Sequence, residues 1–160
     1  MSRKSSYSKQ WTPHLLSVLR IAVALLFIEH GSEKLFGFPS SGQFAFDSLT
    51  PLMWVSALLE FFGGLLILFG LFTRPVTFLL SGEMAVAYFM VHASQGFFPL
   101  QNRGELAALY SFVFLFLACA GGGRWSVDNL LLLWRRSRRT RRGSATPPKA
   151  RAPKPTTVWP

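Results

Sequence analysis

A long apolar stretch with ionisable residues inside it constrains this chain more than any other feature. The stretch contains Arg20 and ends in the cluster Glu29, His30, Glu33 and Lys34. On a helix, residues four positions apart lie on the same side, so His30 lies above Lys34, and Arg20 points toward that side as well. Charged groups of both signs are expensive in lipid. We therefore expect a membrane-crossing helix that turns its charged side toward protein or a water-filled cavity.

Three further apolar segments follow, each close to the roughly 20 helical residues needed to cross a bilayer. The predicted spans are 13–33, 51–72, 75–92 and 105–121. After the last span, Ser126 has the residue type and position to cap a short interfacial helix. The predicted fold class is therefore all-α: an integral-membrane four-helix transmembrane bundle within a membrane domain of residues 13–134.

Positive charge gathers at the two ends of the chain, which carries 17 Lys and Arg and a formal net charge of +10. A basic segment, residues 1–12, precedes the first span, and an Arg/Pro-rich tail, residues 135–160, is predicted to be disordered. The positive-inside rule then places both termini in the cytoplasm and requires an even number of spans. We interpret the tail as a segment that attracts anionic lipid, and expect no nucleic-acid partner.

Several classes of chemistry find no support in the sequence. Cys119 is the only cysteine, so this chain alone cannot form an intrachain disulfide, a CxxC redox pair or an iron–sulfur cluster. A Gly-rich phosphate loop and a Ser/His/Asp spacing are both lacking. We therefore predict no intrinsic cofactor and no self-contained catalytic motif.

Glu60 and Glu83 each lie near the middle of an apolar span. A carboxylate at that depth costs about 2.5–3.5 kcal/mol even on the lenient insertion scale. One interpretation is structural: an ion pair, with Arg20 as the obvious partner for either residue, or a protonated carboxyl bonded to a neighbouring helix. The other interpretation is a role in proton handling or ligand binding. The sequence leaves both open.

His30 and His92 are both expected near the outer ends of their helices. An unperturbed histidine titrates near physiological pH, so His30 is a candidate for proton exchange at that surface. The cluster around it could equally be a self-neutralised helix end. A haem held by the two histidines, or a metal held by them with Glu105, is disfavoured. Either site would require the fold to bring together residues that are far apart in the sequence. Glu83 and His92 should point in opposite directions on a straight helix.

Four separated segments together resemble one protein family. They are RIAVALLFIEHGSEKLFGF, ALLEFFGGLLILFGLFTR, GEMAVAYFMVHASQGFFPLQNRGELAALY and GGGRWSVD, in this order and at these spacings. Over about residues 15–130 the set resembles the DoxX family of four-helix prokaryotic membrane proteins. The positions typical of the family are Arg20, His30, Gly31, Lys34, Glu60, Gly63, Gly64, Arg74, His92, Glu105 and Asp128.

The resemblance implies a multi-pass protein of the bacterial inner membrane with a role in respiratory or redox-stress chemistry. Our first hypothesis is a quinone-linked redox or respiratory accessory subunit, in which a partner redox enzyme carries the electrons. In it His30 and Glu60 exchange protons, while Arg20 and Lys34 steady negative charge. The alternative is a non-catalytic scaffold or anchor for a soluble redox enzyme, or a carrier of a small polar ligand.

The predicted site is one polar cavity that opens toward the outer face. Quinone is the ligand class that the family resemblance suggests for it, and no metal site is predicted. The residues expected to line the cavity are Arg20, Glu29, His30, Lys34, Glu60, His92 and Glu105, with Glu83 as a further ligand-binding candidate.

Overall fold

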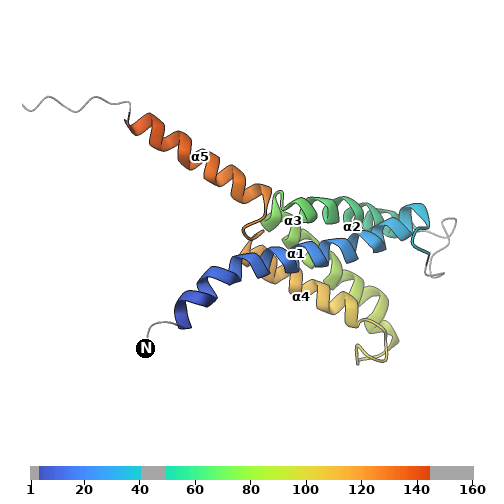
Figure 1. The fold of residues 1–160 in the computed structure, drawn as a ribbon. Coiled ribbons are helices and arrows are strands. Elements are labelled where there is room, and N and C mark those ends of the chain that lie inside the picture. The colour runs from blue at the N-terminus through green and yellow to red at the C-terminus, as the bar shows by residue number, and fades with distance from the viewer. Residues whose placement is uncertain (1–3, 41–49, 145–160) are drawn as a thin grey trace, which may run out of the picture.

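The computed structural model describes residues 4–40 and 50–144, and within these ranges all regular structure is helical. The elements, shown in Figure 1, are α1 (Lys4–Phe36), α2 (Pro51–Phe69), α3 (Thr73–Ala87), the π-helical turn η2 (Tyr88–His92), the 3-10 turn η3 (Ala93–Gln95), α4 (Glu105–Ala120) and α5 (Val127–Ser144). In the described part, three stretches are long and apolar enough to cross a membrane, namely Lys9–Phe36, Pro51–Phe69 and Thr73–Gln95; α4 is a shorter apolar helix. The predicted all-α class is confirmed.

Two helices extend further than predicted. α1 begins at Lys4 and continues through Pro13, because an established helix propagates into its flanks at little cost. The carbonyl of Pro13 accepts hydrogen bonds from Ser17 Oγ (2.9 Å) and from the N–H of Arg124 (3.1 Å). α5 runs to Ser144, so the first part of the tail predicted to be disordered is helical, as suits its helix-favouring arginines. Residues 145–160 lie outside the described ranges.

The bundle consists of two helix pairs. α1 packs along α2 and α3 along α4, whereas α2 and α3 contact each other less and diverge from their shared turn (Figure 1). Glycines allow the close approach of α1 to α2. A Cβ atom on Gly31 would lie 2.5 Å from the backbone N of Phe61. Gly63 faces α3 instead, where a Cβ would lie 2.9 Å from a methyl group of Leu80.

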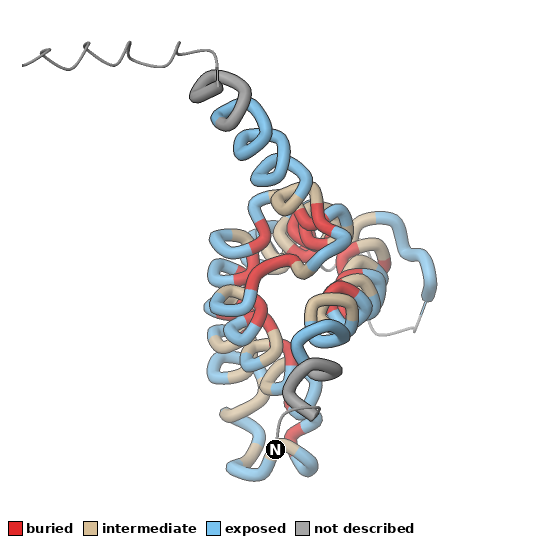
Figure 2. Tube along the Cα trace, turned by 60° about the vertical axis from the view of Figure 1, so that its left-hand side comes forward, coloured by how far each residue is buried: buried red, intermediate tan, exposed pale blue. Residues whose placement is uncertain are grey.

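The apolar core lies where the two pairs meet. The ring of Phe27 on α1 contacts Phe114 and Tyr110 of α4 edge-on, with centroids 4.8 and 5.3 Å away. Figure 2 shows the buried residues along the sides of the helices that face one another. The core residues are Val23, Ala24, Phe27, Ile67, Leu80, Met84, Tyr110, Phe114 and Leu117. Most other large apolar side chains point outward, as expected where the surroundings are lipid.

α5 projects away from the bundle (Figure 1), and its residues 130–139 are exposed on all sides. Its start is as predicted, since Ser126 Oγ accepts a hydrogen bond from the N–H of Asn129 (3.2 Å). Within the helix, the guanidinium of Arg138 lies 3.7 Å above the centre of the Trp134 ring. A start with four leucines and one tryptophan, followed by arginines, suits the boundary between hydrocarbon and lipid headgroups.

Candidate functional site

An ion pair joins α1 to α2 inside the bundle. Lys34 Nζ lies 2.7 Å from Glu60 Oε1, and the two side chains are 13% and 4% exposed. Ser56, one turn before Glu60, accepts a hydrogen bond from Lys34 Nζ (3.2 Å) and donates one to Glu60 Oε1 (3.3 Å). The other oxygen, Glu60 Oε2, is buried and has no hydrogen-bond partner in residues 4–40 and 50–144. The structural interpretation of Glu60 therefore holds for one oxygen and leaves the second available.

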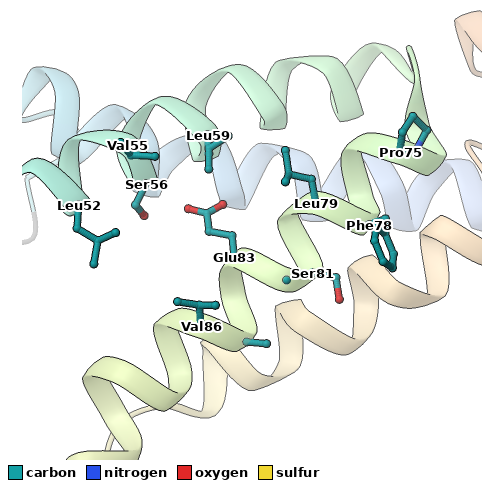
Figure 3. Close-up of a pocket in the computed structure, with 12 residues that line it drawn as sticks. Leu52, Val55, Ser56, Leu59, Pro75, Phe78, Leu79, Ser81, Glu83 and Val86 are labelled. Atoms are coloured by element: carbon teal, nitrogen blue, oxygen red, sulfur yellow. The ribbon is translucent and has the colours of Figure 1, made fainter.

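The second intramembrane carboxylate, Glu83, has no comparable partner. Both of its oxygens are buried and make no hydrogen bond within the described residues. Figure 3 shows its carboxyl group pointing from α3 toward Ser56 and Leu59 of α2. A buried acceptor without a donor costs about 1–3 kcal/mol, and more when it is charged. A bound proton, or a donor supplied by a ligand, would remove this cost.

Glu83 lies in a groove between α2 and α3 with a volume of about 710 Å³ (Figure 3). The groove exists because the two helices diverge from their common turn. Its walls are mostly apolar; Phe78 and Leu52, for example, are 68% and 57% exposed. Such exposed apolar side chains on membrane-crossing helices face the same surroundings as the rest of the lipid-exposed surface. The groove therefore combines an opening toward hydrocarbon with a polar floor formed by Ser56 and Glu83.

Arg20 lies elsewhere and performs a different task. It is fully buried and donates to the carbonyls of Gly122 (2.8 Å) and Trp125 (2.8 Å), and to those of Ile67 and Leu68. Carbonyls at the C-terminus of a helix lack intrahelical donors and carry partial negative charge, so a guanidinium fits them well. The expectation that Arg20 pairs with Glu60 or Glu83 was wrong, because backbone carbonyls satisfy it instead.

Asp128 completes the connection at this end of the bundle. Its two carboxylate oxygens accept hydrogen bonds from the N–H groups of Phe72 (2.9 Å) and Thr73 (2.8 Å), at the start of α3. Its own N–H donates to the carbonyl of Gly70 (3.0 Å). We call this arrangement of Arg20, Gly70, Gly122, Ser126 and Asp128 the basal clasp, and this end of the bundle the basal end.

The two histidines are not brought together around a common cavity. The ring of His30 meets the ring of Tyr110 on α4, with centroids 6.1 Å apart. His92 Nδ1 lies 3.0 Å from the carbonyl oxygen of Asn102, in the loop that precedes α4. Asn102 is itself buried and holds that loop, because its amide donates to Gly96 O and accepts from the N–H of Gly104 (both 2.8 Å).

The remaining predicted residues, Glu29 and Glu105, are exposed. The structure thus places Lys34 and Glu60 at Ser56, which also lines the groove that holds Glu83, whereas Arg20 lies at the basal end and His92 at the loop before α4. Sequence reasoning missed Ser56 as a member of the site, although its spacing of four residues from Glu60 was the signal for it. The part of the chain that the structure describes contains no group of three or more His, Cys, Asp or Glu side chains placed to hold a metal.

Comparison with known proteins identifies relatives of similar length. The chain is 44% identical over 127 residues to a Haemophilus influenzae protein named only as uncharacterized, covering 76% of this chain and 93% of the relative. It is 35% identical over 118 residues to the inner membrane protein YqjF of Escherichia coli, covering 71% and 89%. A second Haemophilus influenzae protein, also named as uncharacterized, is 31% identical over 124 residues, covering 72% and 82%. No solved structure matches significantly.

The DoxX family model matches residues 15–93, which include most of α1, all of α2 and α3, and the ion pair between Lys34 and Glu60. Together with the relatives, which extend over most of the helical region, this match confirms the resemblance seen in the sequence. The chain belongs to the DoxX family and is a multi-pass inner-membrane protein.

Proposed function

We propose that the groove between α2 and α3 binds the headgroup of a quinol, and that the chain is the membrane subunit of a quinone-linked redox or respiratory system. One observation carries the proposal. Three buried carboxylate oxygens, Oε2 of Glu60 and both oxygens of Glu83, find no donor among the residues that the structure describes, and Glu83 lies in a groove walled by apolar side chains.

The ligand class follows from what these atoms need. Carboxylate oxygens accept hydrogen bonds, so the ligand should present donors, as the two hydroxyl groups of a quinol do. The apolar walls suit its ring and hydrocarbon tail. A volume of about 710 Å³ lies in the range of ordinary small-molecule pockets. Because the groove opens toward lipid, an apolar ligand would reach it without crossing water.

The chemistry assigned to this chain is proton handling. Oxidation of a quinol to a quinone releases two protons and two electrons. Glu83 would accept one proton from a bound hydroxyl, and Glu60 would accept the other through Oε2. Lys34 would fix the local charge, and Ser56 lies between the two carboxyl groups. The electrons would pass to a partner redox enzyme that holds a flavin, haem or metal centre.

Compared with the hypothesis from sequence, the roles shift toward Glu83. Arg20 is fully occupied by backbone carbonyls, and His30 packs against an aromatic ring away from the groove. Neither residue is needed for the proposed proton transfer. Lys34 keeps its predicted role, because its ammonium lies next to a carboxylate that would otherwise carry an uncompensated charge.

Glu83→Gln tests the proposal, with Glu105→Gln as the matched control on an exposed carboxyl. The full chain is purified in mild detergent, and quinone in its organic extract is measured by mass spectrometry. We expect stoichiometric quinone in the wild type and the control, and about tenfold less in Glu83→Gln, because one hydrogen bond to a charged acceptor is lost. Phospholipid without quinone in the wild type, or equal loss in both variants, would overturn the proposal.

The second candidate function is the non-catalytic scaffold or anchor. Two observations favour it. Lys34 and Glu60 neutralise each other, and Arg20 joins backbone segments, so in both places the charged groups stabilise the fold. Glu60→Gln in cells separates the two functions. A lower protein level with an unchanged redox phenotype supports the scaffold, whereas a redox defect at a normal protein level supports the quinol site.

We further propose that both termini lie in the cytoplasm. The basal end carries Arg74, Arg124 and the arginines of α5, and positive charge next to a span favours the cytoplasmic side. A reporter enzyme that is active only in the cytoplasm should be active when it is fused after Pro160. Activity of a periplasm-specific reporter at the same position would contradict this orientation.

A further inference from the structure

A second cavity, separate from the α2–α3 groove, lies at the basal end. It has a volume of about 620 Å³ and is bounded by the first part of α1, the start of α3, the glycine-rich loop after α4 and the start of α5. We propose that it binds the phosphate group of an anionic phospholipid, with Arg74 and Arg135 as the cationic residues.

The two arginines come from different elements and lie at the same cavity. Arg74 belongs to the first turn of α3 and Arg135 to α5, and neither guanidinium group forms an ion pair or hydrogen bond with the described residues. The guanidinium of Arg74 lies along the loop, since a Cβ on Gly121 would be 3.5 Å from its Nε. Guanidinium groups bind phosphate oxygens through paired, charge-assisted hydrogen bonds.

The cavity also offers an unused donor. Thr73 lines it, is fully buried, and its Oγ1 has no hydrogen-bond partner within the described part of the chain. One carboxylate, Asp128, shares the cavity, but both of its oxygens already accept N–H groups at the start of α3. The cavity therefore has two positive charges and a free hydroxyl donor. Its one negative charge, on Asp128, is already hydrogen-bonded to backbone N–H groups.

The rest of the lining distinguishes a lipid from a free phosphate ion. Leu16, Leu131 and Leu132 line the same cavity as the two arginines. A soluble phosphate would gain nothing from these walls, whereas the glycerol and upper acyl chains of a phospholipid would bury apolar surface against them. The combination of cationic and apolar lining fits a phosphodiester that is attached to hydrocarbon.

The test measures phosphatidylglycerol bound to the full chain by native mass spectrometry in detergent. The variant is Arg74→Gln/Arg135→Gln, and the control is Arg136→Gln/Arg139→Gln, which removes the same charge from α5 but changes no residue that lines the cavity. We expect phosphatidylglycerol to bind the control like the wild type, and the cavity variant at least about tenfold more weakly. An equal loss in both double variants would show diffuse attraction and overturn the site.

Two further arms identify the source of the phosphate. Millimolar inorganic phosphate should not displace the lipid, and phosphatidylcholine with the same acyl chains should bind more weakly because its choline repels the arginines. Displacement by inorganic phosphate, or equal binding of the two lipids, would overturn the assignment to an anionic phospholipid. If the double variant does not fold, Arg135→Gln alone repeats the test, because Arg135 is an exposed residue of α5. An affinity of this variant for phosphatidylglycerol like that of the wild type would count against the site.

Discussion

Replacing Arg20 by methionine should strongly destabilise the basal end of the bundle. The substitution keeps much of the side-chain volume and removes all four hydrogen bonds that Arg20 donates. The carbonyl of Ile67 would keep a donor, the N–H of Gly70 at 2.9 Å. The carbonyls of Leu68, Gly122 and Trp125 would lose the donor that Arg20 gives them.

The magnitude follows from those three carbonyls. Each buried acceptor left without a donor costs about 1–3 kcal/mol, and breaking a buried charged network typically costs about 3–5 kcal/mol. Water can reach a helix end more easily than a core, so we expect about 3–5 kcal/mol of lost unfolding free energy rather than the full sum. Arg20→Lys, which keeps the charge and some donors, should lose roughly half as much.

The assay is equilibrium unfolding of purified protein in mixed micelles of mild detergent and SDS, followed by tryptophan fluorescence. Hydrogen exchange in residues 70–73 and 121–128 gives a local readout, because the guanidinium joins the end of α2, just before the first segment, to the second segment. A loss below about 1 kcal/mol, with unchanged exchange in both segments, would refute the clasp as a source of stability.

Three other outcomes follow from contacts already described. Lys34→Met should lower the unfolding free energy in SDS by about 3–5 kcal/mol, because it leaves the buried carboxylate of Glu60 uncompensated. Adding Glu60→Leu should recover most of this loss, and full additivity of the two changes would contradict the pairing. Gly122→Ala should reduce the folded yield, since its Cβ would lie 2.7 Å from two side-chain atoms, whereas Gly82→Ala, with nothing within 4 Å, should be neutral or slightly stabilising. Asp128→Asn removes one of the two acceptors at the start of α3 and should lower the unfolding free energy by about 1–3 kcal/mol. Hydrogen exchange at the first residues of α3 should rise, and unchanged exchange there would argue against the role of Asp128 as a cap.

The helical fold was predictable because the apolar runs are long and the turns between them carry glycine and proline. Which charged residues meet was not predictable to the same degree. Arg20 and Lys34 lie on the same side of α1, and either could have reached Glu60. The outcome depends on how far α1 slides along α2, which the close contact of Gly31 with Phe61 fixes.

The basal clasp shows a second limit of sequence reasoning. The groups that Arg20 binds are backbone carbonyls, and every residue has one, so no residue type marks them. Asp128 was visible as a family-typical acid. Because it follows the predicted cap Ser126 by two residues, the sequence places it in the first turn of its own helix, whereas in the structure it binds the start of α3. Long-range capping of this kind needs the loop after α4 to fold back, and only the structure shows that it does.

The short length of α4 has a consequence for the way the protein fits its bilayer. Its 16 residues rise about 24 Å, which is less than the roughly 30 Å of hydrocarbon in a typical membrane. The loop before it exposes Phe97, Phe98 and Leu100, with exposed fractions of 85%, 59% and 75%, and so extends the apolar surface beyond the helix end. His92 and Asn102 hold this loop in place. A histidine remote from the groove would then set the hydrophobic thickness that the protein presents to the surrounding lipid.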